Sequence, residues 1–350
     1  GILLSGDEED DINNFFIDSE FPTPKEVTQI IEALSAAPEG LSLPQLCGRL
    51  NIRNNRIEKA LLLLTLESPA PISKEKFKYV LTTSDLSPSF WERAERLTRL
   101  RRAEWKQMQD YVALENKHME FLIGALDGQA EGYTRPDIQP ISQDIEKETI
   151  QAAVEYINRS SFPIEQRRQW RVSEQLPAYG FKGNIASKFR NEEGRVLSVW
   201  GDPGWGLHVR NGKAAGHFSD ELVEALAGMI LDWRPEPRPV WLTYVPSPRH
   251  PNLVPDCARR LAKRLAIHCV QTLRIQKDYP PQKTMQNSQQ QLQNLDGVFA
   301  VLKDSIQPGP CILFDDIVDS KWTFTVCGAL LKQNEVAEVF PVALASTSPS

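Results

Sequence analysis

CILFDDIVDSKWT, residues 311–323, is the stretch that decides how the second half of the chain is interpreted. Its first four residues are apolar and predict a buried strand, and the carboxylates Asp315 and Asp316 follow at the C-terminal end of that strand. A turn with hydroxyl side chains then leads into an apolar segment that predicts a helix. In an open α/β sheet, ligands bind at the carboxyl ends of the strands. The stretch therefore predicts a ligand site.

The residue types in this stretch suit a phosphorylated ribose. Two adjacent carboxylates accept hydrogen bonds from a cis-diol, and they also hold Mg²⁺ directly or through water. The start of the following helix offers backbone N–H groups and a favourable dipole to a phosphate. An acidic sheet end without any ligand is the alternative explanation for the same pattern.

Strands and helices alternate through residues 240–350. Apolar runs and periodic apolar stripes predict the order strand 240–245, helix 254–266, strand 270–275, strand 297–302, strand 311–316, helix 322–332 and strand 336–345. This alternation indicates an α/β domain with a mostly parallel sheet flanked by helices. The Gln- and Asn-rich run at 286–294 is predicted to be a mobile surface loop.

Residues 150–239 are predicted to form a subdomain of helices and a β-hairpin that packs on this sheet. Helices are expected at 150–157 and 221–233, and the turn GDPG separates two strand candidates, 196–200 and 206–210. Several side chains of the subdomain are candidates for the ligand cleft, with core or turn roles as the alternative. They are Trp200, Trp205, His208 and His217.

A compact pattern at residues 23–84 predicts a winged helix. Thr23 caps a first helix, and a short strand, two helices at 44–50 and 53–66, and a β-hairpin follow. The third helix of such a fold can enter the major groove of DNA. Residues 85–127 predict a helical hairpin, and 128–149 have the composition of a linker. The whole chain is therefore expected to be a multidomain protein with α/β and α+β parts.

A DNA surface is expected on the winged helix. Its candidate DNA-binding residues are Arg49, Arg53, Asn54, Asn55, Arg56, Lys74, Lys76 and Lys78. Alternate spacing along a strand would place the three lysines on one face, where they can contact phosphates and release counterions. A winged helix that contacts protein instead of DNA is the alternative.

The composition is that of an ordinary globular protein rather than a basic protein that coats DNA. The 350 residues carry a formal net charge of -6, so any nucleic-acid surface must be a local patch. No apolar stretch long enough to cross a membrane and no signal peptide is seen, which predicts a cytoplasmic protein without a membrane partner. None of the 5 cysteines has CxxC spacing, so we expect buried free thiols and no zinc.

The stretch at 311–323 resembles the ribose-phosphate signature of type I phosphoribosyltransferases. YVPSPRHP at 244–251 stands where that family keeps its pyrophosphate loop, and KDYPPQK at 277–283 resembles the flexible loop of its ComF-like members. The resemblance implies a domain over 240–350 that binds ribose 5-phosphate or phosphoribosyl pyrophosphate (PRPP) with Mg²⁺. The family usually has Gly where Lys321 stands, a position that favours close backbone approach or a positive φ.

The resemblance assigns roles to individual residues. Asp319 matches the position used as a catalytic base in purine-salvage members. The ribose and its 5-phosphate would be bound by Asp315, Asp316, Ser320, Lys321, Trp322 and Thr323. The pyrophosphate loop would contribute Ser247, Pro248, Arg249 and His250, and the flexible loop would contribute Lys277, Gln282 and Lys283.

The order of the segments resembles the C-terminal part of a RecQ-like DNA helicase of the RqlH type. Residues 1–22 resemble the tail of a helicase core, and RRAEWKQMQDYVALENKHMEFLIGALD, 101–127, is similar to the helical part of the RecQ zinc element. The first zinc cysteine would fall near Lys117 or His118, where none stands, so zinc is expected to be lost. The chain lacks a GxxxxGK[ST] phosphate loop, so ATP is expected to bind in an upstream helicase core.

These resemblances imply an accessory module of an ATP-dependent 3′-5′ DNA helicase that acts in DNA repair and recombination. The winged helix would bind duplex DNA, and the phosphoribosyltransferase-like domain would bind the phosphorylated ribose. Two alternatives stay open. One is an active PRPP-dependent phosphoribosyltransferase fused to a helicase, and the other is an inert fold that serves as a protein-interaction scaffold.

Overall fold

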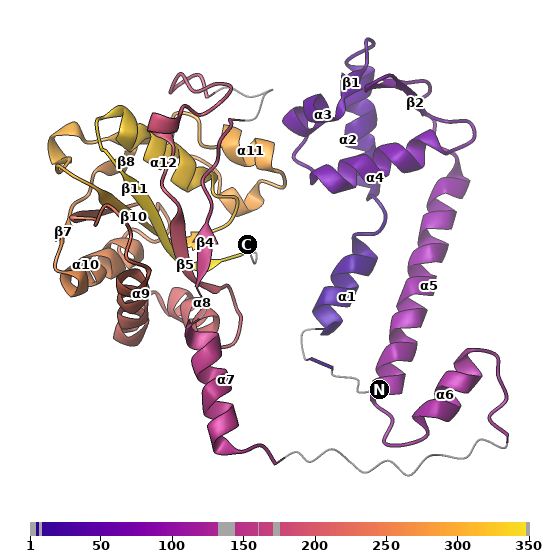
Figure 1. The fold of residues 1–350 in the computed structure, drawn as a ribbon. Helices are drawn as coiled ribbons and strands as arrows, with labels where there is room; N and C mark the ends of the chain where they lie inside the picture. The colour runs from indigo at the N-terminus through magenta and orange to yellow at the C-terminus, as the bar shows by residue number, and fades with distance from the viewer. Residues whose placement is uncertain (1–4, 7–8, 132–143, 160, 171–175, 348–350) are drawn as a thin grey trace. The chain divides into compact units, whose positions relative to one another are not determined.

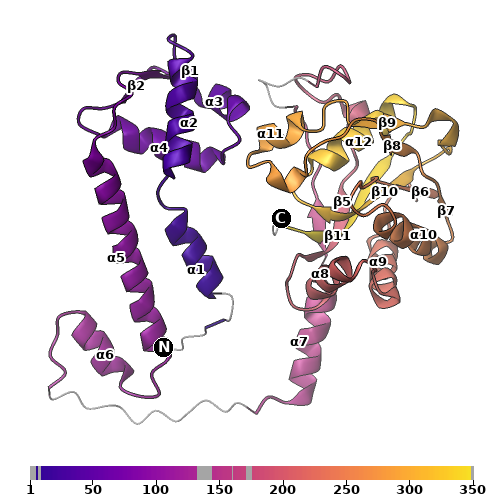
Figure 2. The same ribbon diagram turned by 180° about the vertical axis from the view of Figure 1, so that it is seen from behind.

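Two compact units, Gly1–Gln143 and Asp144–Ser350, make up the chain (Figure 1; Figure 2). The computed structural model describes residues 5–6, 9–131, 144–159, 161–170 and 176–347. Within these ranges, no helix is both long enough and apolar enough to cross a membrane. The two are called the N-terminal unit and the C-terminal unit below.

The N-terminal unit combines a helical core with a small antiparallel sheet. Its elements are α1 (Glu9–Asp18), α2 (Pro24–Ser35), β1 (Leu41–Ser42), α3 (Leu43–Arg49), α4 (Asn54–Thr65), β2 (Ile72–Glu75), β3 (Lys78–Leu81), α5 (Pro88–Val112) and α6 (His118–Ala125). The strands lie in the order β1-β3-β2, each antiparallel to its neighbour. The predicted succession of helix, strand, two helices and hairpin is therefore confirmed, as are the two helices after it.

Local sequence explains where α2 begins and which face it buries. The Thr23 side chain accepts a hydrogen bond from the Glu26 amide, and the Glu26 carboxylate accepts one of 2.7 Å from the Thr23 amide. This reciprocal cap satisfies two amides that the first turn leaves without helical partners. Val27, Ile30 and Leu34 then recur at helical spacing and are buried in one cluster with α4.

The C-terminal unit is a sheet with helices on both faces. Its helices are α7 (Lys147–Arg159), α8 (Trp205–Ala215), α9 (Asp220–Trp233), α10 (Leu253–Leu265), α11 (Ser288–Gln293) and α12 (Trp322–Gln333). Its strands are β4 (Phe162–Ile164), β5 (Gly194–Val199), β6 (Trp241–Tyr244), β7 (His268–Cys269), β8 (Leu273–Ile275), β9 (Phe299–Val301), β10 (Cys311–Val318) and β11 (Val339–Ser346). The main sheet has the order β4-β5-β11-β10-β6-β7 and is parallel except for β4, whereas β8 and β9 form a separate antiparallel pair.

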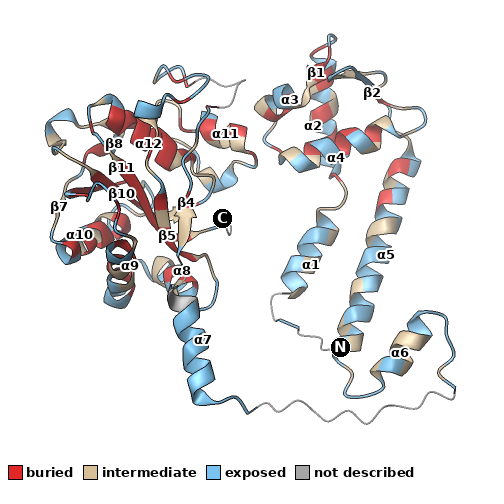
Figure 3. Cartoon of the chain, in the orientation of Figure 1, coloured by how far each residue is buried: buried red, intermediate tan, exposed pale blue. Residues whose placement is uncertain are grey.

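Side chains of alternate residues in the central strand β10 pack into two hydrophobic cores, one on each face of the sheet. Ile312 and Phe314 pack with α8, α9 and α10, whereas Cys311 and Leu313 pack with α11 and α12. Both faces are covered, and Figure 3 shows β10 and β11 buried. This double burial explains why the strand has a continuous apolar run instead of an alternating pattern.

The strand predicted at 206–210 is wrong, because these residues belong to helix α8. The chain reverses after β5 through Gly204, whose φ is 85°. Gly206 then lies so close to β5 that a Cβ there would come within 1.9 Å of the Val199 carbonyl oxygen. Val209, next on the same helix face, is buried against the sheet. Strands β4 and β5 both belong to the main sheet, so the segment before residue 240 adds two strands to that sheet.

The Gln- and Asn-rich run at 286–294 contains helix α11, where a mobile loop was predicted. The Asn287 side-chain oxygen accepts hydrogen bonds from the amides of Gln289 and Gln290 and so caps the helix. Leu292 is fully buried in the core shared with α12. The Asn287 cap and the burial of Leu292 stabilise this short helix. The Gln- and Asn-rich composition of the segment reveals neither of them.

Candidate functional site

A cleft of about 730 Å³ opens beside the C-terminal half of β10. Three segments that lie far apart in the sequence meet in it. The predicted site residues that line the cleft are Ser247, Pro248, Arg249, His250, Gln282, Lys283, Asp315, Asp316, Asp319, Ser320, Lys321 and Thr323. Lys277 and Trp322, which were also predicted as site residues, do not line it.

The cleft exists because β6 ends before β10 does. Tyr244, the last residue of β6, pairs with Phe314, and β10 continues to Val318 beside β11. After Tyr244 the chain leaves the sheet as the loop 245–250, which exposes one edge of β10 to the cleft. Asp315 and Asp316 lie within the strand, as the predicted range 311–316 implied, but β10 continues two residues beyond them, to Val318.

Asp316 leaves β10 on the face covered by α8 and forms an ion pair there. Lys213 Nζ lies 2.7 Å from Asp316 Oδ2, and Asp316 is only 6% exposed. Lys213 also lines the cleft, so the pair is part of the cleft wall. Such a partner offsets part of the cost of taking a carboxylate out of water.

Asp315 leaves β10 on the opposite face, where Tyr279 also lines the cleft. Burial and the neighbouring Asp316 carboxylate raise the pKa of Asp315 well above its ordinary value, although the Asp316 amide donates a 2.9 Å hydrogen bond to Asp315 Oδ1. Burial also raises the pKa of Tyr279, to about 12. Desolvation therefore favours the protonated form of both groups. A protonated carboxyl both donates and accepts hydrogen bonds, which suits a sugar hydroxyl.

Two side chains from other segments hold Asp319 in place. Thr347, which follows β11, donates a 2.6 Å hydrogen bond from Oγ1 to Asp319 Oδ1. Gln291 of α11 donates one of 3.1 Å from Nε2 to Asp319 Oδ2. The orientation of this carboxylate is therefore set by contacts from α11 and from the residue that follows β11.

Residues 320–323 form the turn that opens α12. Lys321 has a φ of 67°, which is the backbone conformation that favours glycine. Lys321 adopts this conformation although it carries a side chain. Its Nζ lies 3.7 Å from Glu165 Oε2. The first amides of α12 have no carbonyl partners within the helix, so the turn can bind a phosphate.

Trp322 supports this turn from the core instead of facing the cleft. It is 1% exposed, and its Nε1 donates a 2.7 Å hydrogen bond to Ser288 Oγ. The Arg167 guanidinium lies 3.8 Å from the centre of its ring and donates a 3.0 Å hydrogen bond from Nε to the Ser320 carbonyl oxygen. The expectation that the Trp322 side chain contacts a ligand does not fit this placement.

The two predicted loops differ in how they reach the cleft. In the loop 245–250, Ser247 Oγ accepts a 3.3 Å hydrogen bond from the His250 amide, and the Arg249 side chain is exposed. Gln282 is fixed by Asn294, whose Nδ2 donates a 2.7 Å hydrogen bond to Gln282 Oε1. Lys277 points elsewhere, because its Nζ donates to the Asp296 carbonyl oxygen at 3.2 Å.

Sequence reasoning missed several residues of the cleft, namely Arg210, Lys213, Tyr279 and Thr347. Arg210 and Lys213 lie three residues apart on one face of α8. That spacing is a signal only when the segment is recognised as a helix, and it had been predicted in part as a strand. Trp200, which the sequence did offer as a candidate, lines the cleft.

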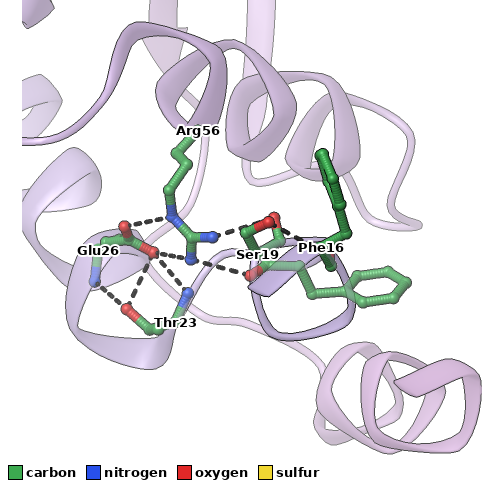
Figure 4. Close-up of polar contacts among 6 residues, drawn as sticks. Phe16, Ser19, Thr23, Glu26 and Arg56 are labelled. Atoms are coloured by element: carbon green, nitrogen blue, oxygen red, sulfur yellow. Dashed lines mark hydrogen bonds and ion pairs between the residues drawn. The ribbon is translucent and has the colours of Figure 1, made fainter. Parts of the chain in front are cut away.

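In the N-terminal unit, Arg56 is occupied by contacts inside the protein (Figure 4). Its Nε and Nη2 each lie 2.6 Å from a Glu26 carboxylate oxygen. Nη1 and Nη2 also donate 3.0 Å hydrogen bonds to the carbonyl oxygens of Ser19 and Phe21. Because its guanidinium is bonded to Glu26 of α2 and to the segment between α1 and α2, Arg56 is left out of the DNA surface proposed below.

The three hairpin lysines had been predicted to share one face, but they do not. Lys74 pairs with Tyr79 across the hairpin and Glu75 pairs with Lys78, so Lys74 and Lys78 project from opposite faces. The strand alternation is broken by the turn at Lys76, whose φ is 57°. Lys78 Nζ also donates a 3.2 Å hydrogen bond to the Glu39 carbonyl oxygen.

Phe77 is a feature of the hairpin that sequence reasoning missed. It stands beside Lys76 at the tip and is 69% exposed. An aromatic residue between two lysines in a predicted hairpin turn was the available signal. Along α4, Arg53 and Asn55 are exposed near the helix start, as is Arg49 of α3. Exposed apolar side chains follow at Leu62, near the end of α4, and at Leu66, the residue that caps this helix.

No protein-family model matches the chain, and no curated protein matches it. The described residues contain no group of three or more His, Cys, Asp or Glu side chains that could hold a metal ion. The five cysteines are free thiols, and Cys269 alone among them is not fully buried.

Proposed function

We propose that the C-terminal unit binds a phosphorylated ribose, and that the chain is the accessory module of a RecQ-like ATP-dependent 3′-5′ DNA helicase acting in repair and recombination. One observation carries the ligand part of this proposal. The segments 247–250, 282–283 and 315–323 were singled out separately in the sequence, and they line a single cleft. The carboxylates, the phosphate-binding turn and the basic loop are thus within reach of one small molecule.

The contacts of each group suggest how the ligand lies. The ribose hydroxyls would bond to Asp315 and Asp316, and the 5-phosphate would sit on the amides and hydroxyl of residues 320–323. A diphosphate at the other end of the sugar would face Arg249. Because Asp316 is already paired with Lys213, the site fits Mg²⁺ only when the phosphates of the ligand complete its coordination.

Titration calorimetry with PRPP and Mg²⁺ tests the ligand proposal. We expect saturable binding by the full chain and a loss of roughly tenfold or more in Asp315→Asn and in Thr323→Val. The matched control is Asp304→Asn, an exposed carboxylate outside the cleft. Absence of binding by both PRPP and ribose 5-phosphate would leave the scaffold alternative. Release of pyrophosphate in the presence of an acceptor base would favour the transferase alternative.

We further propose that the N-terminal unit is a winged helix that binds duplex DNA through its hairpin. The specific observation in favour is the hairpin tip, where the exposed side chains of Lys74, Lys76 and Phe77 lie close together in sequence. Lysines attract the phosphate backbone, and an exposed aromatic ring can stack on a base at an opened end of the duplex. The apolar end of α4 makes that helix less suited to reading the major groove.

Fluorescence anisotropy with labelled duplex across a salt series tests the DNA proposal. Lys74→Glu and Lys76→Glu are each expected to weaken binding and to lower the salt dependence by about one phosphate contact. Lys25→Glu, an exposed lysine on α2, is the matched control. Lys78→Glu should have the smaller effect, because Lys78 is bonded to Glu39. Equal effects at all four positions would point to non-specific charge and contradict a hairpin contact.

A further inference from the structure

A groove of about 470 Å³ lies between α1 and the first turns of α4. It belongs to the N-terminal unit and is separate from the hairpin and from the ligand cleft. Aromatic rings form one wall and basic or amide side chains form the other. The residues that matter are Phe15, Phe16, Arg53, Asn55, Lys59 and Arg101.

The aromatic wall is unusually open to water. Phe15 and Phe16 are 48% and 65% exposed, and their ring centres lie 5.8 Å apart. Helix α1 has no buried residue at all. Leaving a phenylalanine ring exposed forgoes the free energy of burying it, so two adjacent exposed rings mark a surface that a partner can cover.

Polar contacts, and not the two rings, hold α1 in place. At its C-terminal end Arg56 bonds to the carbonyl oxygens of Ser19 and Phe21, and Asp18 pairs with Arg102 of α5 at 2.8 Å. At its other end the Asp10 carboxylate accepts a 3.1 Å hydrogen bond from Trp105 Nε1. The groove is therefore preformed, and both rings keep about half or more of their surface exposed.

The opposite wall carries positive charge that the protein does not neutralise. Arg56 is paired with Glu26, and Arg101 is paired with Glu104 and Glu20. Among the described residues, Arg53 and Lys59 have no ion-pair partner, and both are exposed. The Arg53 guanidinium lies 5.2 Å from the centre of the Phe15 ring, so cation and ring already face the same space.

We propose that this groove binds a single strand of nucleic acid, with bases stacked on Phe15 and Phe16 and phosphates at Arg53 and Lys59. Aromatic faces beside unpaired cations are the combination that single strands require. An acidic peptide would satisfy the cations but would leave the rings in water. The inference deepens the proposed DNA function: α4, roughly 18 Å long at 1.5 Å per residue, connects the groove at its start to the hairpin that follows its end.

Anisotropy of the full chain with a short fluorescein-labelled oligothymidylate, and separately with a blunt duplex, tests this inference. Phe16→Ala should weaken oligothymidylate binding by roughly fivefold to a hundredfold and leave duplex binding unchanged. Leu66→Ala is the matched control, because it removes a similarly exposed apolar side chain outside the groove, at the residue that caps the end of α4. Lys59→Glu should weaken binding of the single strand, with Lys25→Glu as its control.

Three outcomes would overturn the inference. These are unchanged oligothymidylate affinity in Phe16→Ala, an equal loss in Leu66→Ala, and displacement of the oligonucleotide by polyglutamate at matched charge. The proposal that the hairpin binds duplex is tested by a different measurement, the affinity for the blunt duplex. Lys76→Glu should affect the duplex alone, so a chain that fails to bind duplex can still show Phe16-dependent binding of the single strand.

Discussion

Lys213 Nζ lies 2.7 Å from Asp316 Oδ2, so helix α8, which precedes the loop 245–250, supplies the counter-ion for an aspartate of the candidate site. The two residues are about a hundred positions apart in the sequence. Because Asp316 is only 6% exposed, this contact offsets part of the cost of burying its carboxylate. The ion pair thus ties the integrity of the cleft to the placement of α8.

Lys213→Met removes the counter-ion and leaves the buried carboxylate unsatisfied. We expect the free energy of unfolding to fall by about 1–3 kcal/mol, the cost of an unpaired buried polar group. The measurement is urea unfolding, with the exposed Lys263→Met of α10 as the control, expected to change by less than about 0.5 kcal/mol. Equal midpoints for the two variants would show that the ion pair contributes nothing.

Asp315 predicts an unusual dependence of stability on pH. Burial and Asp316 raise its pKa in the folded chain, so between the ordinary carboxyl pKa of about 4 and the raised value the folded protein binds a proton that the unfolded chain has released. Stability contributed by this group therefore declines as the pH rises through that interval. Asp315→Asn should be more stable than the wild type at pH 8 and should lose less stability between pH 4 and 8. The measurement is the melting temperature of both variants and the wild type across this pH range, with Asp304→Asn as the control. If Asp315→Asn follows the pH dependence of the wild type, as Asp304→Asn should, the raised pKa of Asp315 is contradicted.

Trp322 should matter for stability and little for ligand affinity. Trp322→Ala is expected to cost about 3–5 kcal/mol, because the ring is buried beneath the turn and stacks on Trp170. Trp322→Phe keeps most of the packing and loses the hydrogen bond to Ser288, which costs about 1 kcal/mol. Calorimetry on folded Trp322→Phe should return wild-type affinity for PRPP. A tenfold loss there, with the fold intact by circular dichroism, would instead place the indole in the site.

Arg53 and Arg56 were both predicted from the sequence to bind DNA, but their substitution should affect stability differently. Arg56→Met breaks the pair with Glu26 and the bonds that hold α1, and should destabilise the N-terminal unit by about 1.5–3 kcal/mol. Arg53→Met, at an exposed position, should leave stability unchanged. Chemical unfolding of the full chain measures both, and the distinction fails if the two variants lose the same amount.

The same pair also predicts acid sensitivity. Burial alone would raise the pKa of Glu26, but hydrogen bonds from Arg56 and Thr23 outweigh it and lower the pKa. The stabilisation is therefore present near neutral pH and is lost as the pH falls through the lowered value. In Arg56→Met this acid-dependent loss should shrink, and an unchanged acid limb in that variant would contradict the assignment.

Local signals in the sequence predicted most elements of the fold. The Thr23 cap and the apolar stripe after it located α2, and the apolar run 311–314 located β10 and the covered sheet around it. Such signals succeed because capping and burial act over a few residues. They failed at 206–210 and at 286–294, where a close approach of Gly206 to Val199 and the burial of Leu292 decided the conformation.

The sequence by itself singled out the segments that meet at the candidate site: the adjacent aspartates, the hydroxyl turn and the basic loop can be identified in order along the chain. Only the tertiary structure decided which side chains reach the cleft. It brought in Lys213 from α8, turned Trp322 into the core and set Lys74 and Lys78 on opposite faces of their hairpin. The physical reason is that residue type and spacing define a local element. The direction of a side chain, in contrast, depends on where the neighbouring strand ends and which helix covers each face.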